Sequence, residues 1–339
     1  MDSWILKGVK TLVNEPQSVS ISSPTQVKVK VSHLLLTETD ALLYEGKIEA
    51  KYPKIPGRAA IGIITEVGEK CYGIEKGMRV YLKPTRACGE CLPCKSGKPK
   101  ECTSCISAGR DFDGFMRDFV VCDQDDVAPL PDSIDVNCAL CIEKIGIAEN
   151  TYDKLNLSAG QRVAVIGADL AGLLIAQVLL YHKVVPVCID NNPANLERAK
   201  KCGVYYAFPA DDDLLSNVIN VTGGNMCDAA VYCATSPLPL SVVTELVGDC
   251  KTVVLCFNSL MNATLSANDI ISKNMTVTSV AYAYDYTNAV INMLVHNAVN
   301  LQPFEKEMLS EYDPAKLLNE FCENRAKYQN KLTVFKMIL

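Results

Sequence analysis

Apolar and polar residues alternate with a period of two along much of the first 150 residues. Residues 20–35 (SISSPTQVKVKVSHLL), 62–69 (GIITEVGE) and 76–84 (KGMRVYLKP) carry this alternation, with glycine turns between them, and 115–123 (FMRDFVVCD) is predicted as another short strand. The pattern is typical of half-buried antiparallel strands. It predicts a mainly β first region that ends in a helical segment over 136–155.

The pattern of hydrophobic residues changes after this helical segment. An apolar strand (QRVAVIG, ending at Gly167) precedes a helix (LAGLLIAQVLLYH), a second strand (VVPVCID) and a helix that opens at NNPANLERAKKCG. AAVYCAT (229–235) and KTVVLCFN (251–258) continue the series. Strands that alternate with helices at this spacing predict a parallel, doubly wound α/β sheet. The alternation ends near residue 285, and a helical stretch and a final strand (LTVFKMI) follow.

Composition and charge narrow the class of protein. The 339 residues are enough for two domains, and a formal net charge of -6 argues against a nucleic-acid partner. No apolar run reaches the ~20 residues of a membrane span, and the N-terminus does not read as a signal peptide. Twelve of the 16 cysteines are scattered singly in the chain. We therefore expect free thiols and a cytoplasmic protein.

The remaining four cysteines form the most specific motif of the sequence. Cys88, Cys91, Cys94 and Cys102 follow a C-x2-C-x2-C-x7-C pattern on a loop rich in Gly, Pro and Lys. Such short spacings let one turn wrap a tetrahedral Zn²⁺ with four thiolates. A site of this kind has no open position for substrate, so the motif predicts one structural zinc and no catalysis.

A glycine loop lies between the first parallel strand and its helix, in VAVIGADLAGLLIAQ. Gly167 supplies the tight turn, Gly172 the close helix–strand packing, and Leu170 lies between them among the expected cofactor-binding residues. The middle glycine of G-x-G-x-x-G is replaced by Asp169. Its carboxylate adds bulk and like charge near a pyrophosphate, so we expect weakened dinucleotide binding; a vestigial loop is the alternative.

Asp190 ends the second parallel strand, at the distance expected for an acid that binds the adenosine ribose. An acid there favours NAD(H) over NADP(H). The alternative is a helix N-cap ahead of Asn191, Asn192 and Pro193.

Together these motifs resemble the medium-chain, zinc-containing alcohol dehydrogenase superfamily, which includes sorbitol and threonine dehydrogenases. The resemblance also rests on Thr39, Asp40, Tyr44 and Gly46 in a T-D-x-x-x-Y-x-G run, on PGRAAIGIITEVGE and on FDGFMRDFV. It implies a GroES-like catalytic domain over 1–154 and 286–339, with the zinc lobe near 86–104, and a Rossmann domain over 155–285. It also implies a homodimer or homotetramer.

The catalytic zinc pattern of the family is broken. The family's C-G-x-D stands here as Thr37-Glu38-Thr39-Asp40, its G-H-E as Gly57-Arg58-Ala59, and its E-P as Glu143-Lys144. A threonine hydroxyl is a poor zinc ligand and a guanidinium is none at all. We predict that Arg58 takes the place of the metal and pairs with Glu143, which would otherwise be a buried unpaired charge; a solvent-exposed Arg58 is the alternative.

Two further residues match family positions near the substrate. Thr39 matches the hydroxyl that relays a proton from the alcohol, although an ordinary turn residue fits equally well. Tyr44 matches an aromatic position that lines the substrate site. Without zinc, Thr39, Arg58 or Tyr44 could donate a hydrogen bond to the developing alkoxide.

Three functions remain open at this point. The first is an NAD(H)-dependent oxidoreductase of small alcohols or carbonyls without catalytic zinc. The second is a non-catalytic relative that binds a small molecule or a partner chain. The third is a zinc dehydrogenase with a rebuilt metal site, which would have to use residues such as His33, His182, His296 or the cysteines near Glu143.

Overall fold

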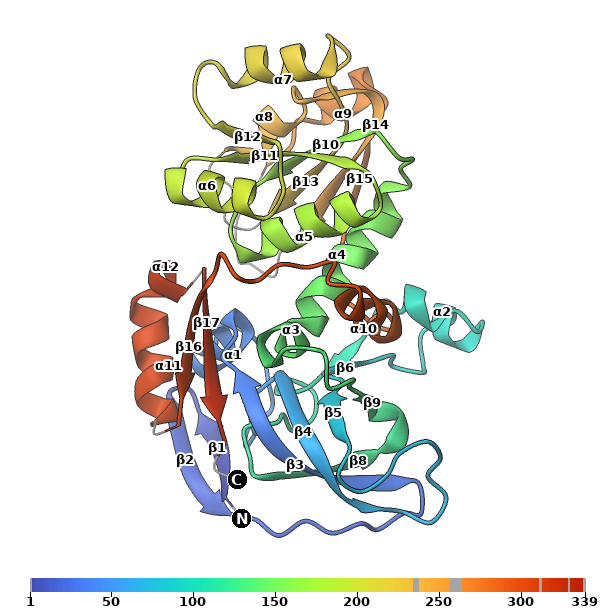
Figure 1. The fold of residues 1–339 in the computed structure, drawn as a ribbon, viewed down its shortest axis with the longest axis vertical. Helices are drawn as coiled ribbons and strands as arrows, with labels where there is room; N and C mark the ends of the chain where they lie inside the picture. The colour runs from blue at the N-terminus through green and yellow to red at the C-terminus, as the bar shows by residue number, and fades with distance from the viewer. Residues whose placement is uncertain (1, 234–237, 257–263, 311–312, 329, 338–339) are drawn as a thin grey trace. The chain divides into compact units, whose positions relative to one another are not determined.

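The computed structural model describes residues 2–233, 238–256, 264–310, 313–328 and 330–337. The chain forms two compact units (Figure 1). Unit 1 comprises residues 1–143, 284–295 and 305–339, and unit 2 comprises 144–283 and 296–304. The predicted division into a GroES-like domain (1–154 and 286–339) and a Rossmann domain (155–285) stays a prediction.

A six-stranded parallel sheet forms the centre of unit 2. Its strand order is β12-β11-β10-β13-β14-β15, so the chain starts in the middle and builds outward in both directions. The strands are β10 (Arg162–Ile166), β11 (Val185–Asp190), β12 (Tyr206–Pro209), β13 (Cys227–Cys233), β14 (Val247–Cys256) and β15 (Thr276–Ser279). The predicted doubly wound sheet is thus confirmed.

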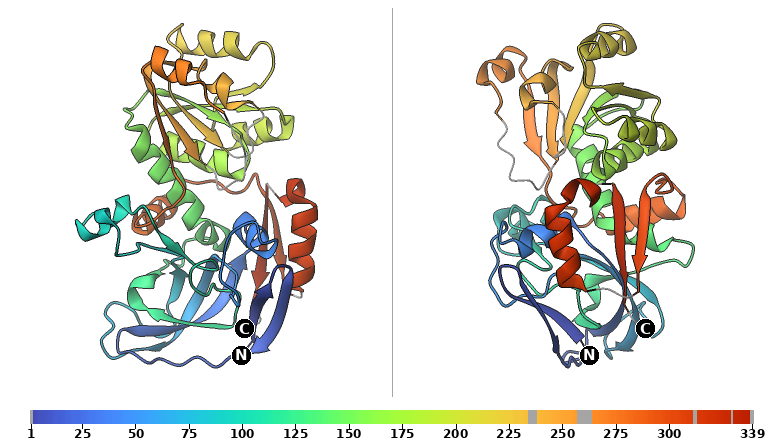
Figure 2. Two further views of the ribbon diagram at one scale, coloured as in Figure 1. Left: turned by 180° about the vertical axis from the view of Figure 1, so that it is seen from behind. Right: turned by 90° about the vertical axis from the view of Figure 1, so that its left-hand side faces the viewer.

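Helices cover both faces of this sheet (Figure 2). They are α4 (Ile142–Leu155, which begins in unit 1), α5 (Leu170–Tyr181), α6 (Pro193–Lys201), α7 (Leu214–Thr222), α8 (Leu240–Val243) and α9 (Ala267–Ser272). Because both faces are covered, the central strands are apolar throughout; Val163 to Ile166 of β10 are fully buried. α5 is apolar around its whole circumference and is buried to match.

Unit 1 is built on a seven-stranded sheet of order β16-β17-β3-β4-β5-β9, with β8 paired to β3. Along β3, Val27, Val29 and Val31 are buried while the lysines between them are partly exposed, which is the predicted period of two. The strands are β3 (Gln26–Leu35), β4 (Ala59–Val67), β5 (Arg79–Leu82), β8 (Phe119–Asp123), β9 (Val127–Pro129), β16 (Glu305–Leu309) and β17 (Lys331–Lys336).

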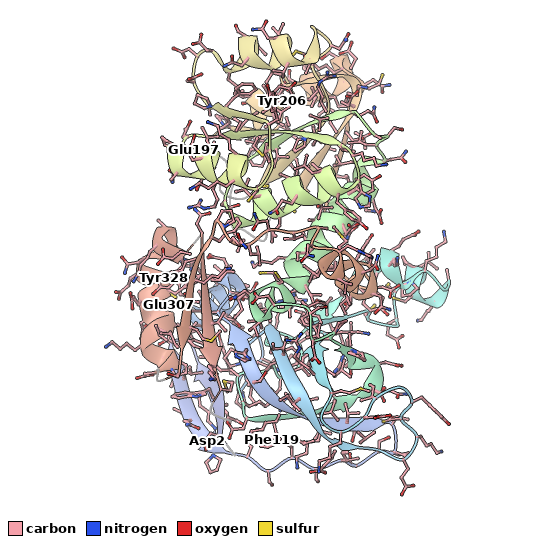
Figure 3. All side chains as sticks on the ribbon, in the orientation of Figure 1. Asp2, Phe119, Glu197, Tyr206, Glu307 and Tyr328 are labelled. Carbon is pink, nitrogen blue, oxygen red and sulfur yellow. The ribbon has the colours of Figure 1, made fainter. Side chains whose placement is uncertain are left out.

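Two small antiparallel pairs and several short helices complete unit 1. The pairs are β1 (Asp2–Gly8) with β2 (Thr11–Pro16) and β6 (Thr85–Arg86) with β7 (Ile106–Ser107). The helices are α1 (Glu38–Tyr44), α2 (Leu92–Lys95), η1 (Pro99–Glu101), η2 (Gln124–Asp126), α3 (Val136–Leu140), α10 (Thr287–Val295), α11 (Pro314–Glu323) and α12 (Arg325–Tyr328). Tyr328 stacks on Phe321 and interacts with Glu307 of β16 (Figure 3).

The structure corrects several predicted boundaries. The strand expected from residue 20 begins only at Gln26, because the backbone N–H groups of Ser22 and Ser23 donate to the Gln26 side chain in a turn. The helix expected over 136–155 is divided at Cys141 into α3 and α4. The ends of three expected strands, at 234–235, 257–258 and 338, lie outside the described residues.

Candidate functional site

The four cysteines of the predicted zinc motif converge on one point. Their sulfur atoms all lie within 4.8 Å of one another, and the Cys91–Cys94, Cys88–Cys102, Cys91–Cys102 and Cys88–Cys94 separations are 3.3, 3.5, 3.8 and 4.0 Å. Zn–S bonds of about 2.3 Å place the sulfurs of a tetrahedral site about 3.8 Å apart. The cluster therefore fits a structural Zn²⁺.

Backbone N–H groups and neighbouring thiols change the pKa values of the cysteines in this cluster. Backbone N–H groups of Cys88 and Cys91 donate to the sulfurs of Cys102 and Cys88. Backbone hydrogen bonds lower the pKa of Cys91 to about 6, whereas burial and then the Cys91 sulfur raise the pKa of Cys94 to about 12. Four thiolates this close together would repel one another, so the thiols cannot all ionise without a metal. A bound Zn²⁺ would allow all four to ionise.

One basic side chain of the cysteine lobe contacts a distant segment of unit 1. The Lys100 ammonium lies 5.0 Å from the centre of the buried Tyr286 ring. Tyr286 enters unit 1 with the segment that begins at residue 284, more than 180 residues after the lobe. This contact gave no signal in the sequence.

Arg58 and Glu143 form a buried ion pair in unit 1. The Arg58 Nη2 contacts Glu143 Oε1, and its Nε lies 3.3 Å from Glu143 Oε2. The guanidinium therefore contacts the carboxylate through two nitrogen atoms. The two side chains are only 9% and 11% exposed. Burial opposes the charge on Arg58, but the Glu143 carboxylate raises its pKa above the ordinary value. Arg58 does not point to solvent.

Two hydroxyl residues that the sequence analysis missed belong to the same cluster. The Thr85 hydroxyl lies 3.3 Å from Arg58 Nη2 and 3.1 Å from Glu143 Oε1. Tyr81 is fully buried beside them, and burial followed by the Glu143 charge raises its pKa well above the usual range. Alternation along β5 would place Tyr81 on the same face as Arg79, opposite Val80 and Leu82, so the period of two did not predict its burial. Nothing in the sequence pairs Thr85 with Glu143.

Thr37, at the position of the family's cysteine ligand, has a structural task. It is the N-cap of α1, and its backbone N–H and hydroxyl donate to Asp40 Oδ2 at 3.0 and 2.6 Å. The other oxygen of Asp40 accepts the N–H of Gly57 at 2.8 Å. Burial raises the pKa of Asp40, although these hydrogen bonds oppose the shift. Asp40 thus ties the start of α1 to the residue before Arg58.

The two other predicted substrate residues lie on α1. Thr39 is half-buried in the first turn of the helix. Tyr44 is 2% exposed, and its hydroxyl donates to the Lys10 carbonyl oxygen at 3.3 Å. Asn319 and Cys322 of α11 also interact with the Tyr44 side chain. The structure therefore places Tyr44 in the core of unit 1 and brings Arg58 together with Glu143, Thr85 and Tyr81 instead.

The glycine loop of unit 2 joins β10 to α5. Gly167 has a φ of +97°, which favours glycine, and a Cβ on Gly172 would lie 1.8 Å from the Gly167 carbonyl oxygen. Asp169 is the N-cap of α5: its Oδ1 accepts the N–H of Gly172 at 3.0 Å, and the residue is 8% exposed. Leu170 is the buried first residue of the helix.

Asp190 is engaged by its own unit. Its Oδ2 accepts the N–H of Ala168 at 2.7 Å and the side-chain amide of Asn195 at 3.1 Å, and its Oδ1 accepts the N–H of Asn192 at 2.8 Å. The N-cap of α6 is Asn192, and not Asp190. Contact between Asp190 and a ribose stays a prediction, and such a contact would have to share the carboxylate with these donors.

The sequence matches two known domain families. Residues 23–132 match the alcohol dehydrogenase GroES-like domain, and residues 171–296 match the zinc-binding dehydrogenase domain. Together these matches span more than half of the chain. The chain belongs to the zinc-type, medium-chain alcohol dehydrogenase superfamily. This is a family of oxidoreductases, and its membership confirms the predicted fold class and resemblance.

Several named relatives are similar over different lengths. L-threonine 3-dehydrogenase of Pyrococcus horikoshii is 27% identical over 86% of both chains. Sorbitol dehydrogenase of Halalkalibacterium halodurans is 30% identical over 62% of both chains, so less than two thirds of that relative is matched. Among solved structures, galactitol-1-phosphate dehydrogenase of Escherichia coli aligns with a TM-score of 0.86 at 18% identity, over 99% of both chains.

An Escherichia coli alcohol dehydrogenase solved with NADH aligns with a TM-score of 0.84 at 23% identity, also over 99% of both chains. At these identities the structural likeness supports the fold.

Within the described parts of the chain, no helix is long and apolar enough to cross a membrane. In the same described parts, the cysteine tetrad is the group of His, Cys, Asp or Glu residues found close enough together to hold a metal ion.

Proposed function

We propose that this chain is an NAD(H)-dependent oxidoreductase that acts on a small alcohol or carbonyl compound without a catalytic zinc. The observation that carries the proposal is the ion pair between Arg58 and Glu143. The family resemblance assigns both positions to the catalytic metal site, and the pair supplies Glu143 with a positive partner from the same chain. Guanidinium cannot bind zinc, so the pair and the metal exclude each other.

The residues around the pair support a site without metal. The Thr37 hydroxyl is used in capping α1, and the guanidinium of Arg58 is held by Glu143 and Thr85. Nicotinamide would supply or accept the hydride when bound. Thr39 is half-buried in the first turn of α1. We propose that its hydroxyl donates a hydrogen bond to the substrate oxygen and relays the proton of the substrate hydroxyl. Arg58 and Glu143 are then positioning residues.

Cofactor choice, assembly and location follow the same proposal. An acid at the Asp190 position favours NAD(H) and repels the 2′-phosphate of NADP(H). Relatives named as sorbitol and threonine dehydrogenases support a small hydroxylated substrate. We also propose a cytoplasmic homodimer or homotetramer, which is the assembly the family resemblance implies.

A second function is favoured by one observation. The Asp169 carboxylate caps α5, the helix whose N-terminus faces the pyrophosphate in a dinucleotide-binding fold. A relative that kept its structural zinc but lost its cofactor would be non-catalytic and would bind a small molecule or a partner chain.

Metal stoichiometry combined with NADH titration separates these functions. For the purified full chain we expect about one zinc per chain by elemental analysis and saturable enhancement of NADH fluorescence. About one zinc without NADH binding would favour the non-catalytic function. About two zincs per chain would overturn both and favour a rebuilt catalytic metal site.

A further inference from the structure

We propose that Asp169 acts as an internal competitor of phosphate and thereby sets the dinucleotide affinity of unit 2. The proposal rests on the proposed function, because it concerns the cofactor site of that function. It assigns a selectivity to one side chain: Asp169 penalises the phosphate groups of a ligand and leaves recognition of adenosine unaffected.

The geometry of the loop directs the Asp169 carboxylate onto the helix. Asp169 has extended backbone angles (φ -75°, ψ -170°), which is the conformation of an N-cap residue. Its Oδ1 accepts the N–H of Gly172, the third residue of α5, at 3.0 Å. With 8% of the residue exposed, the carboxylate is turned toward the helix and not toward solvent.

The loop cannot relax easily to release this carboxylate. Gly172 is fixed against the loop, because even a Cβ there would lie 1.8 Å from the Gly167 carbonyl oxygen. On the other side of Gly167, the N–H of Ala168 is taken by Asp190 at 2.7 Å. Two carboxylates of the chain therefore satisfy the N–H groups of Ala168 and Gly172, at the two ends of a segment that in this fold presents its N–H groups to a pyrophosphate.

Electrostatics decides what this arrangement favours. The N-terminus of a 12-residue helix carries roughly half a positive charge, which one carboxylate already neutralises. An incoming pyrophosphate meets a net negative site and has to displace or tolerate the Asp169 side chain. A neutral nucleoside meets neither obstacle, because it places no charge at the helix terminus.

Three variants separate charge, bulk and a general change in net charge. Asp169→Asn keeps an oxygen that can cap α5 and removes the negative charge. Asp169→Gly removes both charge and bulk. Asp249→Asn is the matched control: it removes one negative charge at an exposed position near the amino end of β14, away from the carboxyl ends of the strands. Thermal unfolding of each variant checks that the unit remains folded.

The measurement is calorimetric titration of the full-length protein with adenosine, ADP-ribose and NADH. We expect Asp169→Asn and Asp169→Gly to bind ADP-ribose and NADH roughly tenfold more tightly than the unsubstituted chain. The adenosine affinity should stay within about twofold, and Asp249→Asn should resemble the unsubstituted chain for all three ligands.

The outcomes that overturn the proposal differ from those that overturn the function. Equal NADH affinities in the unsubstituted chain and both Asp169 variants would overturn the role of Asp169 and leave the proposed function intact. A parallel gain in adenosine affinity would also overturn it, since the effect would not come from phosphate. If no variant binds NADH, the proposed cofactor fails, and this proposal fails with it.

Discussion

The cysteine tetrad and the Arg58–Glu143 pair are two polar clusters of unit 1 that handle buried charge in opposite ways. In the tetrad, four sulfur atoms that favour the same metal lie within 4.8 Å of one another. At the other site, the Glu143 carboxylate faces a guanidinium of its own chain. The positive partner of the first cluster would be a bound metal ion, whereas the positive partner of Glu143 is the Arg58 side chain of the same chain.

Under the proposed function, the two metal sites expected of this family are physically independent. A closed four-thiolate site stabilises its lobe whatever happens at the reaction centre. A catalytic site can lose its metal only if the remaining carboxylate finds another partner, because a lone buried charge is costly. Arg58, with Thr85 beside it, provides that partner.

Removing one thiolate should produce the largest effect. We expect Cys94→Ser to lower the zinc content from about one ion per chain to near zero and to unfold the lobe around α2, because three thiolates no longer close the site. Elemental analysis and hydrogen exchange over residues 86–104 measure this. Cys250→Ser, at an exposed free thiol, is the matched control and should retain its zinc; equal zinc loss in both variants would contradict the assignment.

Breaking the ion pair from one side should cost less but remain large. Arg58→Met leaves Glu143 buried without its cation, and we expect a loss of about 3–5 kcal/mol in the free energy of unfolding, measured with urea. The double variant Arg58→Met with Glu143→Leu should recover most of this loss, because the carboxylate that Arg58 neutralises is removed as well. If the double variant is as unstable as Arg58→Met, the charge of Glu143 is not the cause.

Restoring the family's ligand types tests whether only these positions separate the two sites. In a chain carrying Thr37→Cys and Arg58→His, Glu143 loses its cation, and the two ligand types that the family resemblance assigns to the catalytic zinc are present again. We expect zinc content to rise from about one to about two ions per chain. Arg58→His alone is the control and should stay near one. A double variant that also stays at one would show that further residues, such as Tyr81 or Thr85, exclude the metal.

The capping role of Thr37 should give the smallest effect. Thr37→Ala removes the hydroxyl that bonds Asp40, and we expect a loss of about 1 kcal/mol in the free energy of unfolding. Thr37→Ser retains the hydroxyl and should stay close to the unsubstituted chain. Should both variants lose stability equally, the methyl group of Thr37, and not its hydroxyl, would be the important contact.

The parts of the fold with a regular hydrophobic period could be predicted from the sequence. The parallel strands of unit 2 and the alternating β3 followed directly from that period. Residues 296–304 could not be assigned to unit 2, because they contact residues that are far away in the sequence. For example, the N–H of Asn300 donates a hydrogen bond to the Gln177 side chain at 2.6 Å. The β1–β2 hairpin and the edge strand β15 were likewise not predicted.

The candidate site was predicted only as far as sequence motifs reach. The Arg58–Glu143 contact could be anticipated because both residues occupy positions of one family pattern. The use of Thr37 as an N-cap and the role of Thr85 could not, since each depends on where a hydroxyl points in three dimensions. The donors around Asp190 were hidden for the same reason, as Asn195 reaches it from the following helix.

The position of β17 within the sheet of unit 1 has a consequence for synthesis of the protein. Val334 and Phe335 of β17 pair with Leu35 and Leu34 of β3, and β16 joins the sheet only through β17. The six strands of unit 2 all lie between residues 162 and 279, so they can assemble while the ribosome is still translating. The edge of β3 at residues 33–35 must instead wait until β17 has been translated, because β8 covers only residues 26–30 of that strand. During that interval these residues form an open strand edge, which is prone to mispairing.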